Sequence, residues 1–176
     1  PLTVRSPGRA WKRAGRYGTL IGRAPAEGET LAEAIRRCDD GVDHVKVAQS
    51  GINSLVRYGR LSKAQFTREE LSAAVAAAEE RRLPVMVHAN GPEPVIRAAL
   101  AGCASIEHGF FMGDDALRLL SDLGTVWVPT AVTMKGIADS LPRDDPRREV
   151  ALQNLEDQVR QIRRARDLAV PVATGT

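Results

Sequence analysis

Residues 83–109 read LPVMVHANGPEPVIRAALAGCASIEHG, and this stretch decides the fold. An apolar run at 85–87 ends in His88, a turn and a helical segment follow, and a second short run at 105–107 ends in His108. The pattern predicts a strand, a helix and a second strand. Parallel strands joined by a helix bring their carboxyl ends to one edge of a sheet, so the two imidazoles are expected to converge there. Convergent imidazoles at that edge are what a metal site in an α/β enzyme needs.

The rest of the chain repeats this rhythm of helix and short strand. No G-x-G-x-x-G follows any strand, which argues against a dinucleotide-binding fold. Chemistry-bearing residues at the ends of several strands favour a (β/α)8 barrel over a doubly wound sheet. The predicted fold class is therefore α/β, a partial TIM barrel that is incomplete at both ends. The expected helices are at 30–38, from 67, and at 92–101, 114–123 and 145–166, with a loop or short helix at 134–142; the expected strands are at 42–48, 85–88, 105–108, 125–129 and 170–176.

Local signals place the ends of several helices. Thr30 with Glu33, and Thr67 with Glu70, have the spacing of capping boxes. Asp114 is the expected cap of the helix at 114–123. The expected core positions of the longest helix are Val150, Leu152, Leu155, Val159 and Ile162.

The charge is unevenly distributed. The chain of 176 residues has a formal net charge of +3, yet residues 1–27 hold six basic residues against one acidic residue. Glycine and proline interrupt this segment, so we expect a long basic loop at 1–27 with a short turn near Trp11, ahead of a barrel portion at 28–176. Nucleic-acid contact is one interpretation, and a solvated arginine-rich loop is the preferred one because no recognition motif accompanies the charge.

The sequence contains no apolar run long enough to span a membrane and no signal-peptide pattern. Cys38 and Cys103 lie in apolar contexts and are expected to be buried thiols, which favours a reducing, cytoplasmic location. The chain begins with Pro1 rather than Met, so its natural start is expected to lie upstream.

Lys46 is the most informative single residue. Its ammonium group lies in the valine-rich run 45–47, where desolvation is costly unless something neutralises the charge. Either the side chain reaches solvent, or the strand lies at an edge of the sheet, or the neutral amine reacts, as a nucleophile or with carbon dioxide. The resulting carbamate is an anion with two oxygens that can bridge two divalent metals. The two strand-end histidines downstream favour the functional interpretation.

Each histidine alone could be a core residue, but a pair at equivalent strand ends indicates a site. Lys46, His88 and His108 are the candidate metal ligands, a set that suits zinc best and also admits iron, manganese or nickel. His44 lies at the amino end of its strand and is expected on the barrel floor as a structural residue. Glu107 precedes a candidate ligand, so alternation is expected to point it toward the helices, with no catalytic role.

Four short motifs in order resemble the metal-dependent amidohydrolase superfamily, specifically its imidazolonepropionase- and prolidase-like members. The resemblance implies strands four to eight of the barrel, with a carboxylated Lys46 bridging two zinc ions, His88 on the fifth strand and His108 on the sixth. It also implies a general-base aspartate directly after Thr176 and an H-x-H pair that this sequence does not contain, and it places the loop at 1–27 near the active-site mouth. The motifs are VKVAQSG at 45–51, VMVHANG at 85–91, SIEHGFF at 105–111 and VPVATGT at 170–176.

The implied activity is metal-dependent hydrolysis of an amide or cyclic-amide C–N bond in a small-molecule or dipeptide-like substrate, with this chain expected to be inactive alone. The sequence does not select substrate-binding residues among loop candidates such as Arg57, Tyr58 and Lys135. The alternative is a non-catalytic α/β domain that self-associates through exposed strand edges, as a homo-oligomer or by pairing with the rest of the barrel.

Overall fold

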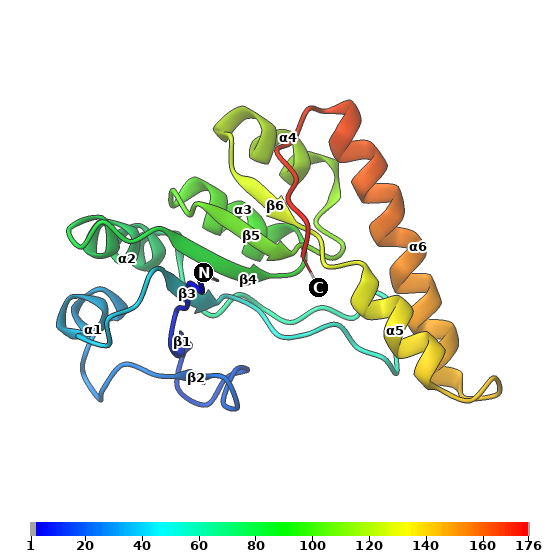
Figure 1. Cartoon of the computed structure of the whole chain (residues 1–176), viewed down its shortest axis with the longest axis horizontal. Coiled ribbons are helices and arrows are strands. Elements are labelled where there is room, and N and C mark those ends of the chain that lie inside the picture. Colours follow the sequence, from blue (N-terminus) through cyan, green and yellow to red (C-terminus); the bar gives the residue numbers. More distant parts are fainter. Residues whose placement is uncertain (1–2, 176) are drawn as a thin grey trace.

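A computed structural model describes residues 3–175, and within them six strands form one parallel sheet (Figure 1). The strand order is β2-β1-β3-β4-β5-β6. This alternation of parallel strands with helices confirms the α/β class. The strands are β1 Ala10–Trp11, β2 Gly22–Arg23, β3 Val45–Ala48, β4 Val85–Ala89, β5 Ser105–His108 and β6 Val126–Val128.

The helices form two groups. Along the sheet, α1 packs on α2, α2 on α3 and α3 on α4, while α5 packs on α6 beyond the end of β6 (Figure 1). No helix within the described part of the chain combines the length and apolarity needed to cross a membrane. The helices are α1 Leu31–Arg37, α2 Arg68–Glu79, α3 Pro92–Leu100, α4 Gly113–Leu123, α5 Val132–Ser140 and α6 Pro146–Asp167.

The register of the sheet separates its two faces. One row across β3, β4, β5 and β6 is apolar and fully buried, and it consists of Val47, Val87, Ile106 and Trp127. In a parallel sheet, residues in register point to the same side and neighbours along a strand point to opposite sides. This apolar row packs with helix residues in the hydrophobic core, and the alternate positions along each strand point to the opposite face of the sheet.

Both predicted capping boxes are present. Thr30 accepts a hydrogen bond from the backbone N–H of Glu33, and Thr67 accepts one from that of Glu70, while each glutamate bonds back to its cap. The predicted aspartate cap of α4 is wrong. The side-chain oxygen of Gln161 on α6 accepts instead, from the backbone N–H groups of Met112 and Gly113 at 3.0 and 3.2 Å. The cap comes from a distant element, which local sequence patterns do not reveal.

The core of α6 also differs from the expectation. Its expected aliphatic positions are only half-buried. Its buried face consists of Ala151, Asn154, Gln158 and Ala165. Amide side chains occupy this face because it meets polar backbone at strand ends and loops, including the carbonyls of Pro129 and Ser54.

The prediction of a long loop at 1–27 with only a short turn near Trp11 is wrong in part. Residues 10–11 and 22–23 form two short strands that extend the sheet beyond β3, with Trp11 in register with Val47. Two-residue strands are too short to show a period in the sequence, and glycine and proline between them hide the pairing. At the other end, the predicted strand at 170–176 is reduced to a single parallel bridge between Trp127 and Val172, and Thr176 lies outside the described residues.

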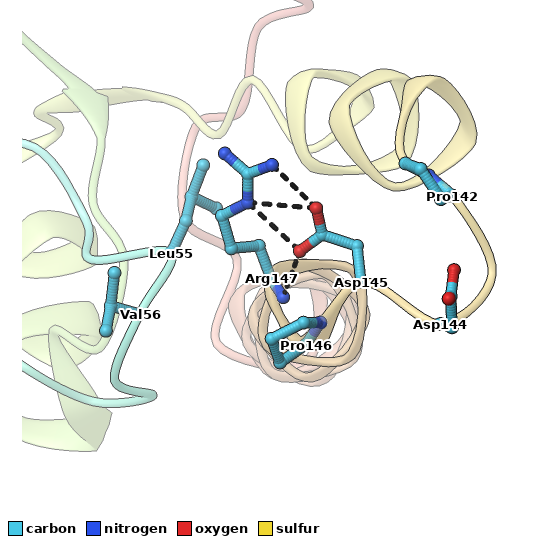
Figure 2. Close-up of a pocket in the computed structure, with 7 residues that line it drawn as sticks. All are labelled: Leu55, Val56, Pro142, Asp144, Asp145, Pro146 and Arg147. Carbon is cyan, nitrogen blue, oxygen red and sulfur yellow. Dashed lines mark hydrogen bonds and ion pairs between the residues drawn. The ribbon is translucent and has the colours of Figure 1, made fainter.

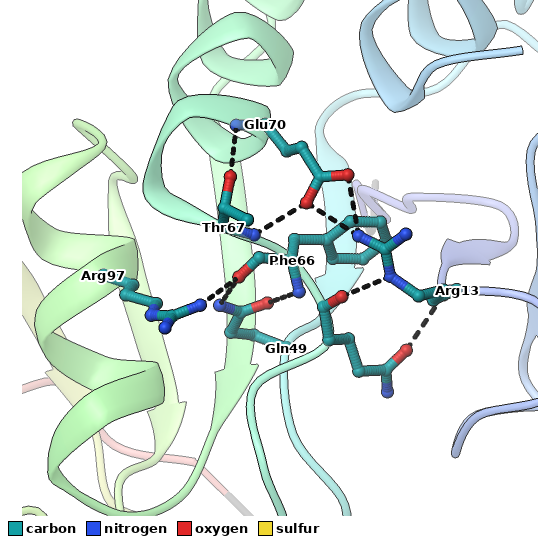
Figure 3. Close-up of polar contacts among 7 residues, drawn as sticks. Arg13, Gln49, Phe66, Thr67, Glu70 and Arg97 are labelled. Atoms are coloured by element: carbon teal, nitrogen blue, oxygen red, sulfur yellow. Dashed lines mark hydrogen bonds and ion pairs between the residues drawn. The ribbon is translucent and has the colours of Figure 1, made fainter.

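Polar contacts fasten the amino-terminal segment to the barrel portion (Figure 3). Arg13 donates from Nη2 to both carboxylate oxygens of Glu70 at 2.7 Å, and its guanidinium lies 5.0 Å from the ring of Phe66. Arg23 pairs with Asp40 and lies over Trp11. These arginines have internal partners, so the basic segment is more than a solvated loop.

Gln49 joins β3 to the start of α2. Its side chain is fully buried, donates to the carbonyl of Phe66 at 2.9 Å and accepts from the N–H of the same residue at 2.9 Å (Figure 3). The amide thus bonds both backbone groups of Phe66, just before α2 begins.

We expect Gln49→Leu to lower the free energy of unfolding by about 1–3 kcal/mol, because the N–H of Phe66 is left buried without a partner. Urea unfolding of both proteins measures the difference. The matched control is Gln153→Leu, whose amide bonds only to Glu149 near the surface, and it should stay within about 0.5 kcal/mol of wild type. Equal stability of the two variants would contradict this role for Gln49.

Candidate functional site

The two histidines meet at the carboxyl edge of β4 and β5. Their ring centroids lie 4.6 Å apart with an interplanar angle of 66°. His88 is 6% exposed, and His108 is half-buried. The sequence motif therefore brings together two imidazoles that are separated by a complete helix.

His108 reaches this position by a break in the strand. Strict alternation would place it on the helix side of the sheet, because Glu107 before it pairs in register with His88. Its φ of 71° lies in the left-handed region, where the chain turns. Its ring nitrogen Nδ1 lies 2.7 Å from Oγ1 of Thr130, which also has a positive φ, of 47°.

The carbonyl of His108 is held from the core. Nε1 of Trp127 donates to it at 3.0 Å, and Nε2 of Gln158 also donates to it. The next residue, Gly109, has a φ of 61°, and a Cβ there would lie 2.5 Å from Nε1 of Trp127. The approach of the indole therefore requires glycine at this position.

His88 is held by the loop that follows β3. Its Nε2 lies 3.2 Å from the carbonyl oxygen of Gly51. Asn90 ties the same loop down, because its Nδ2 donates to Gly51 at 3.1 Å and its backbone N–H donates to Ser50 at 2.8 Å. The carboxamide oxygen of Asn90 accepts from the N–H of Phe110 at 3.0 Å. Every polar atom of the Asn90 side chain is therefore used in positioning the two loops.

Burial keeps both imidazoles neutral. Desolvation lowers the pKa of His88 to about 4, with a smaller opposite effect from the hydrogen bond to Gly51 and a further lowering by Lys46. The pKa of His108 is lowered to about 3, mainly by desolvation and to a smaller extent by the charges of the neighbouring His88 and Lys46. A neutral imidazole offers a lone pair, which is the form that binds a metal.

Lys46 lies on the same face of the sheet as His88. It is two residues before Ala48, which is in register with His88, so it lies one layer deeper. Burial lowers the pKa of its ammonium group, and the carboxylate of Glu107 opposes that shift. Its charge acts on both histidines. A lysine with a lowered pKa has more of the neutral amine that reacts as a nucleophile.

Glu107 does not point toward the helices, as alternation from His108 predicted. It is in register with His88, and Ile106 beside it belongs to the buried row under the helices. Its carboxylate accepts a hydrogen bond from Oγ of Ser105 at 2.7 Å and acts electrostatically on Lys46. The prediction failed because His108, used as the reference for the inner face, is the residue at which alternation breaks.

A cavity of about 150 Å³ opens beside the histidines. Tyr17, from the amino-terminal segment, brings its ring within 5.1 Å of the His88 ring. Asn53, Thr130, Thr133 and Met134 also line the cavity, and none of them was predicted as a site residue. These residues lie in loops or on α5, where no periodic pattern identifies them. The complete lining is Tyr17, Ile52, Asn53, His88, Asn90, His108, Phe110, Thr130, Thr133 and Met134.

A second pocket, of about 520 Å³, lies between the loop after β3 and the turn from α5 to α6 (Figure 2). Its main charged groups are already paired, because Arg147 donates to Asp145 at 2.6 Å and Asp145 caps α6. The pocket has neither imidazole nor amine in its lining. The histidine cavity is therefore the better candidate for a site of chemistry.

The donors available to a metal at the histidine cavity can be counted. Within residues 3–175, no group of three or more His, Cys, Asp and Glu side chains is close enough to hold a metal ion. The paired imidazoles offer two donors, and a metal bound there would need a further donor of another kind. Lys46 is the residue on the same face whose amine can supply it after conversion to an anion.

Comparison with known proteins gives consistent matches. The model of the amidohydrolase family matches residues 10–176. An ochratoxinase of Aspergillus niger is 31% identical over 103 residues, which are 58% of this chain and 21% of that protein. An uncharacterized protein of Mycobacterium tuberculosis is 31% identical over 115 residues, which are 63% of this chain and 31% of that protein.

Solved structures match the fold over nearly the whole chain. A Xaa-Pro dipeptidase with methionine bound in its active site has a TM-score of 0.75 and 28% identity, covering 98% of this chain and 47% of that one. The ochratoxinase structure has a TM-score of 0.76 at 22% identity, covering 99% and 46%. This chain therefore spans about half the length of the solved structures and less than a third of the curated relatives it matches.

We expect Gly109→Ala to destabilise the protein by about 2–5 kcal/mol, because the methyl group is forced against Trp127 and the residue is held at positive φ. Gly113→Ala is the matched control, since its φ is also positive but no atom lies near its added Cβ. That control should lose only about 1–2 kcal/mol.

Urea unfolding compares the two variants, and NMR contacts between the His88 and His108 rings report the site. Loss of those contacts in Gly109→Ala alone is the expected result. Equal stability losses with the ring contacts preserved in both variants would show that the close approach of Trp127 does not position His108.

Proposed function

The chain belongs to the amidohydrolase family, and on that premise we propose that it carries part of the active site of a metal-dependent hydrolase. The substrate is a small molecule or dipeptide-like compound with an amide or cyclic-amide C–N bond. The observation that carries this proposal is the pair of neutral imidazoles 4.6 Å apart, with a buried amine on the same face of the sheet.

His88, His108 and Lys46 are the proposed metal ligands, with Lys46 as its carbamate and zinc as the metal, in a pair of ions. The fit rests on three features of the site. Both rings are held neutral by burial, the lowered pKa of Lys46 favours the amine that reacts with carbon dioxide, and Lys46 lies on the same face of the sheet as His88. A divalent metal bound there supplies a water of lowered pKa and polarises a carbonyl.

The chain's own residues have positioning roles in this proposal. Thr130 occupies Nδ1 of His108 and leaves Nε2 free to bind a metal. The carbonyl of Gly51 orients the ring of His88. Tyr17, whose ring lies beside His88, brings the amino-terminal segment into the lining of the cavity.

The names of the relatives support the substrate class. The matched structures include a Xaa-Pro dipeptidase and a prolidase complexed with N-methylphosphonate-L-proline, and the curated relatives include ochratoxinase. The dipeptidase and prolidase names refer to peptide substrates. We propose an amide of a small amino-acid derivative for this chain.

A second proposal concerns association. Within residues 3–175 the sheet has two edges. Apolar side chains are exposed beside the edge strand β2, at Leu20 and Ile21, and near the opposite edge, at Val172. Unpaired edges with apolar neighbours favour pairing with another chain or with the rest of the barrel.

We expect Lys46→Met to lose bound metal and hydrolytic activity, because the carbamate cannot form. Short carboxylic acids should restore both in part, since they offer the same pair of oxygens. Metal content by mass spectrometry, hydrolysis of a dipeptide and of a small cyclic amide, and the carbamate signal after labelling with ¹³C-bicarbonate measure these effects in the full-length protein.

The matched control is Lys63→Met, a change of the same kind at an exposed loop position. It should keep both metal and rate. If Lys46→Met retained wild-type metal content and rate, Lys46 would have no place in the site.

We expect the 176-residue chain to form a stable oligomer, and Ile21→Lys to weaken it, because a charge beside the open edge opposes strand pairing. Light scattering after size-exclusion chromatography measures the mass. Val132→Lys, a change at an equally exposed apolar residue on α5, is the control. A monodisperse wild-type monomer would contradict edge pairing.

A further inference from the structure

Asn53 is a buried amide without a partner. The residue is 7% exposed, and within residues 3–175 neither its Nδ2 nor its Oδ1 has a hydrogen-bond partner. It lies in the loop after β3 and lines the same cavity as His88 and His108. Buried polar groups in native proteins almost always have partners, so two unpaired atoms on one side chain require an explanation.

Asn90 provides an internal comparison. It is also buried, at 3% exposed, and lines the same cavity, but its Nδ2 donates to Gly51 and its Oδ1 accepts from Phe110. Asn90 therefore has a structural role that satisfies the whole amide. Asn53 has no structural role of this kind, because no atom of the described residues bonds to either end of its amide.

We propose that Asn53 is a specificity-determining residue that binds the substrate through both ends of its amide. A carboxamide offers a donor and an acceptor side by side. Its complement is a group that presents an acceptor and a donor on one edge. An amide does so when its C=O and N–H point the same way, as in a ring, whereas in an open-chain trans amide they point in opposite directions.

The cavity suits such a group. Its volume of about 150 Å³ accommodates one small ring, and Ile52, Phe110 and Met134 supply apolar walls. Asn53 then distinguishes a small cyclic amide from an open-chain one at this position. The inference rests on the proposed amide hydrolysis and, of the open-chain and cyclic amides proposed there as substrates, favours the cyclic amide.

Binding of two matched probes tests the proposal without hydrolysis. Pyrrolidinone carries the C=O and N–H together, and its N-methyl derivative keeps the ring and the C=O but has no N–H. Titrations followed by NMR use the full chain after treatment with a chelator. Three forms are compared: the wild type, Asn53→Leu and Lys46→Met. Wild type should bind pyrrolidinone at least about fivefold more tightly than the N-methyl derivative, because the acceptor of Asn53 is otherwise left unpaired.

Asn53→Leu should bind the two probes equally, and Lys46→Met should keep the wild-type preference. This outcome separates the role of Asn53 from the proposed metal site, because the preference between the probes does not require the proposed metal ligand Lys46. Equal binding of the probes by wild type, a lack of measurable binding of both, or an unchanged preference in Asn53→Leu would each overturn the role of Asn53.

Thermal unfolding adds a second measurement. Asn53→Leu should raise the melting temperature by a few degrees, because it removes a buried amide without partners. Asn90→Leu should lower it, because it leaves the partners of a satisfied amide unpaired. A lower melting temperature for Asn53→Leu with intact native spectra would show that its amide supports the fold and would overturn the proposal.

Discussion

The in-register parallel ladder from β3 to β6 is the constraint on which the rest of the structure depends. It aligns Val47, Val87, Ile106 and Trp127 in one fully buried row. Burial of each such side chain stabilises the fold by about 1.5–3 kcal/mol, and a slip of one residue would move a strand's whole set to the other face. The apolar row therefore fixes where the opposite face presents Lys46, His88 and Glu107.

His108 is the exception that completes the site. A residue other than glycine at positive φ costs about 1–3 kcal/mol and persists only where its surroundings determine it. Here Trp127 and Gln158 bind its carbonyl and Thr130 binds its ring. Each hydrogen bond contributes about 1 kcal/mol, so together they offset the strain. The core residue Trp127 thus acts both in the apolar row and in positioning an imidazole.

Sequence patterns predicted the features that depend on local spacing. The two capping boxes, the strands around Lys46 and His88, and the convergence of the histidines follow from periods of two or three to four residues. The failures have a common cause in tertiary contacts. Gln161 caps α4 from another helix, β1 is a strand only because β3 lies beside it, and the inner face of β5 cannot be deduced from His108.

The residues that line the cavity mark a further limit of sequence reasoning. Asn53 and Asn90 both follow a strand that carries a candidate ligand, and nothing in the sequence distinguishes their roles. The difference appears only when the partners of every buried polar atom are counted. A satisfied amide stabilises the loops it joins, whereas an unsatisfied one costs about 1–3 kcal/mol. The unsatisfied amide of Asn53 lies beside two neutral imidazoles. Natural proteins depart from the rules of stable folding mainly at functional sites, so an unsatisfied amide at this position indicates binding.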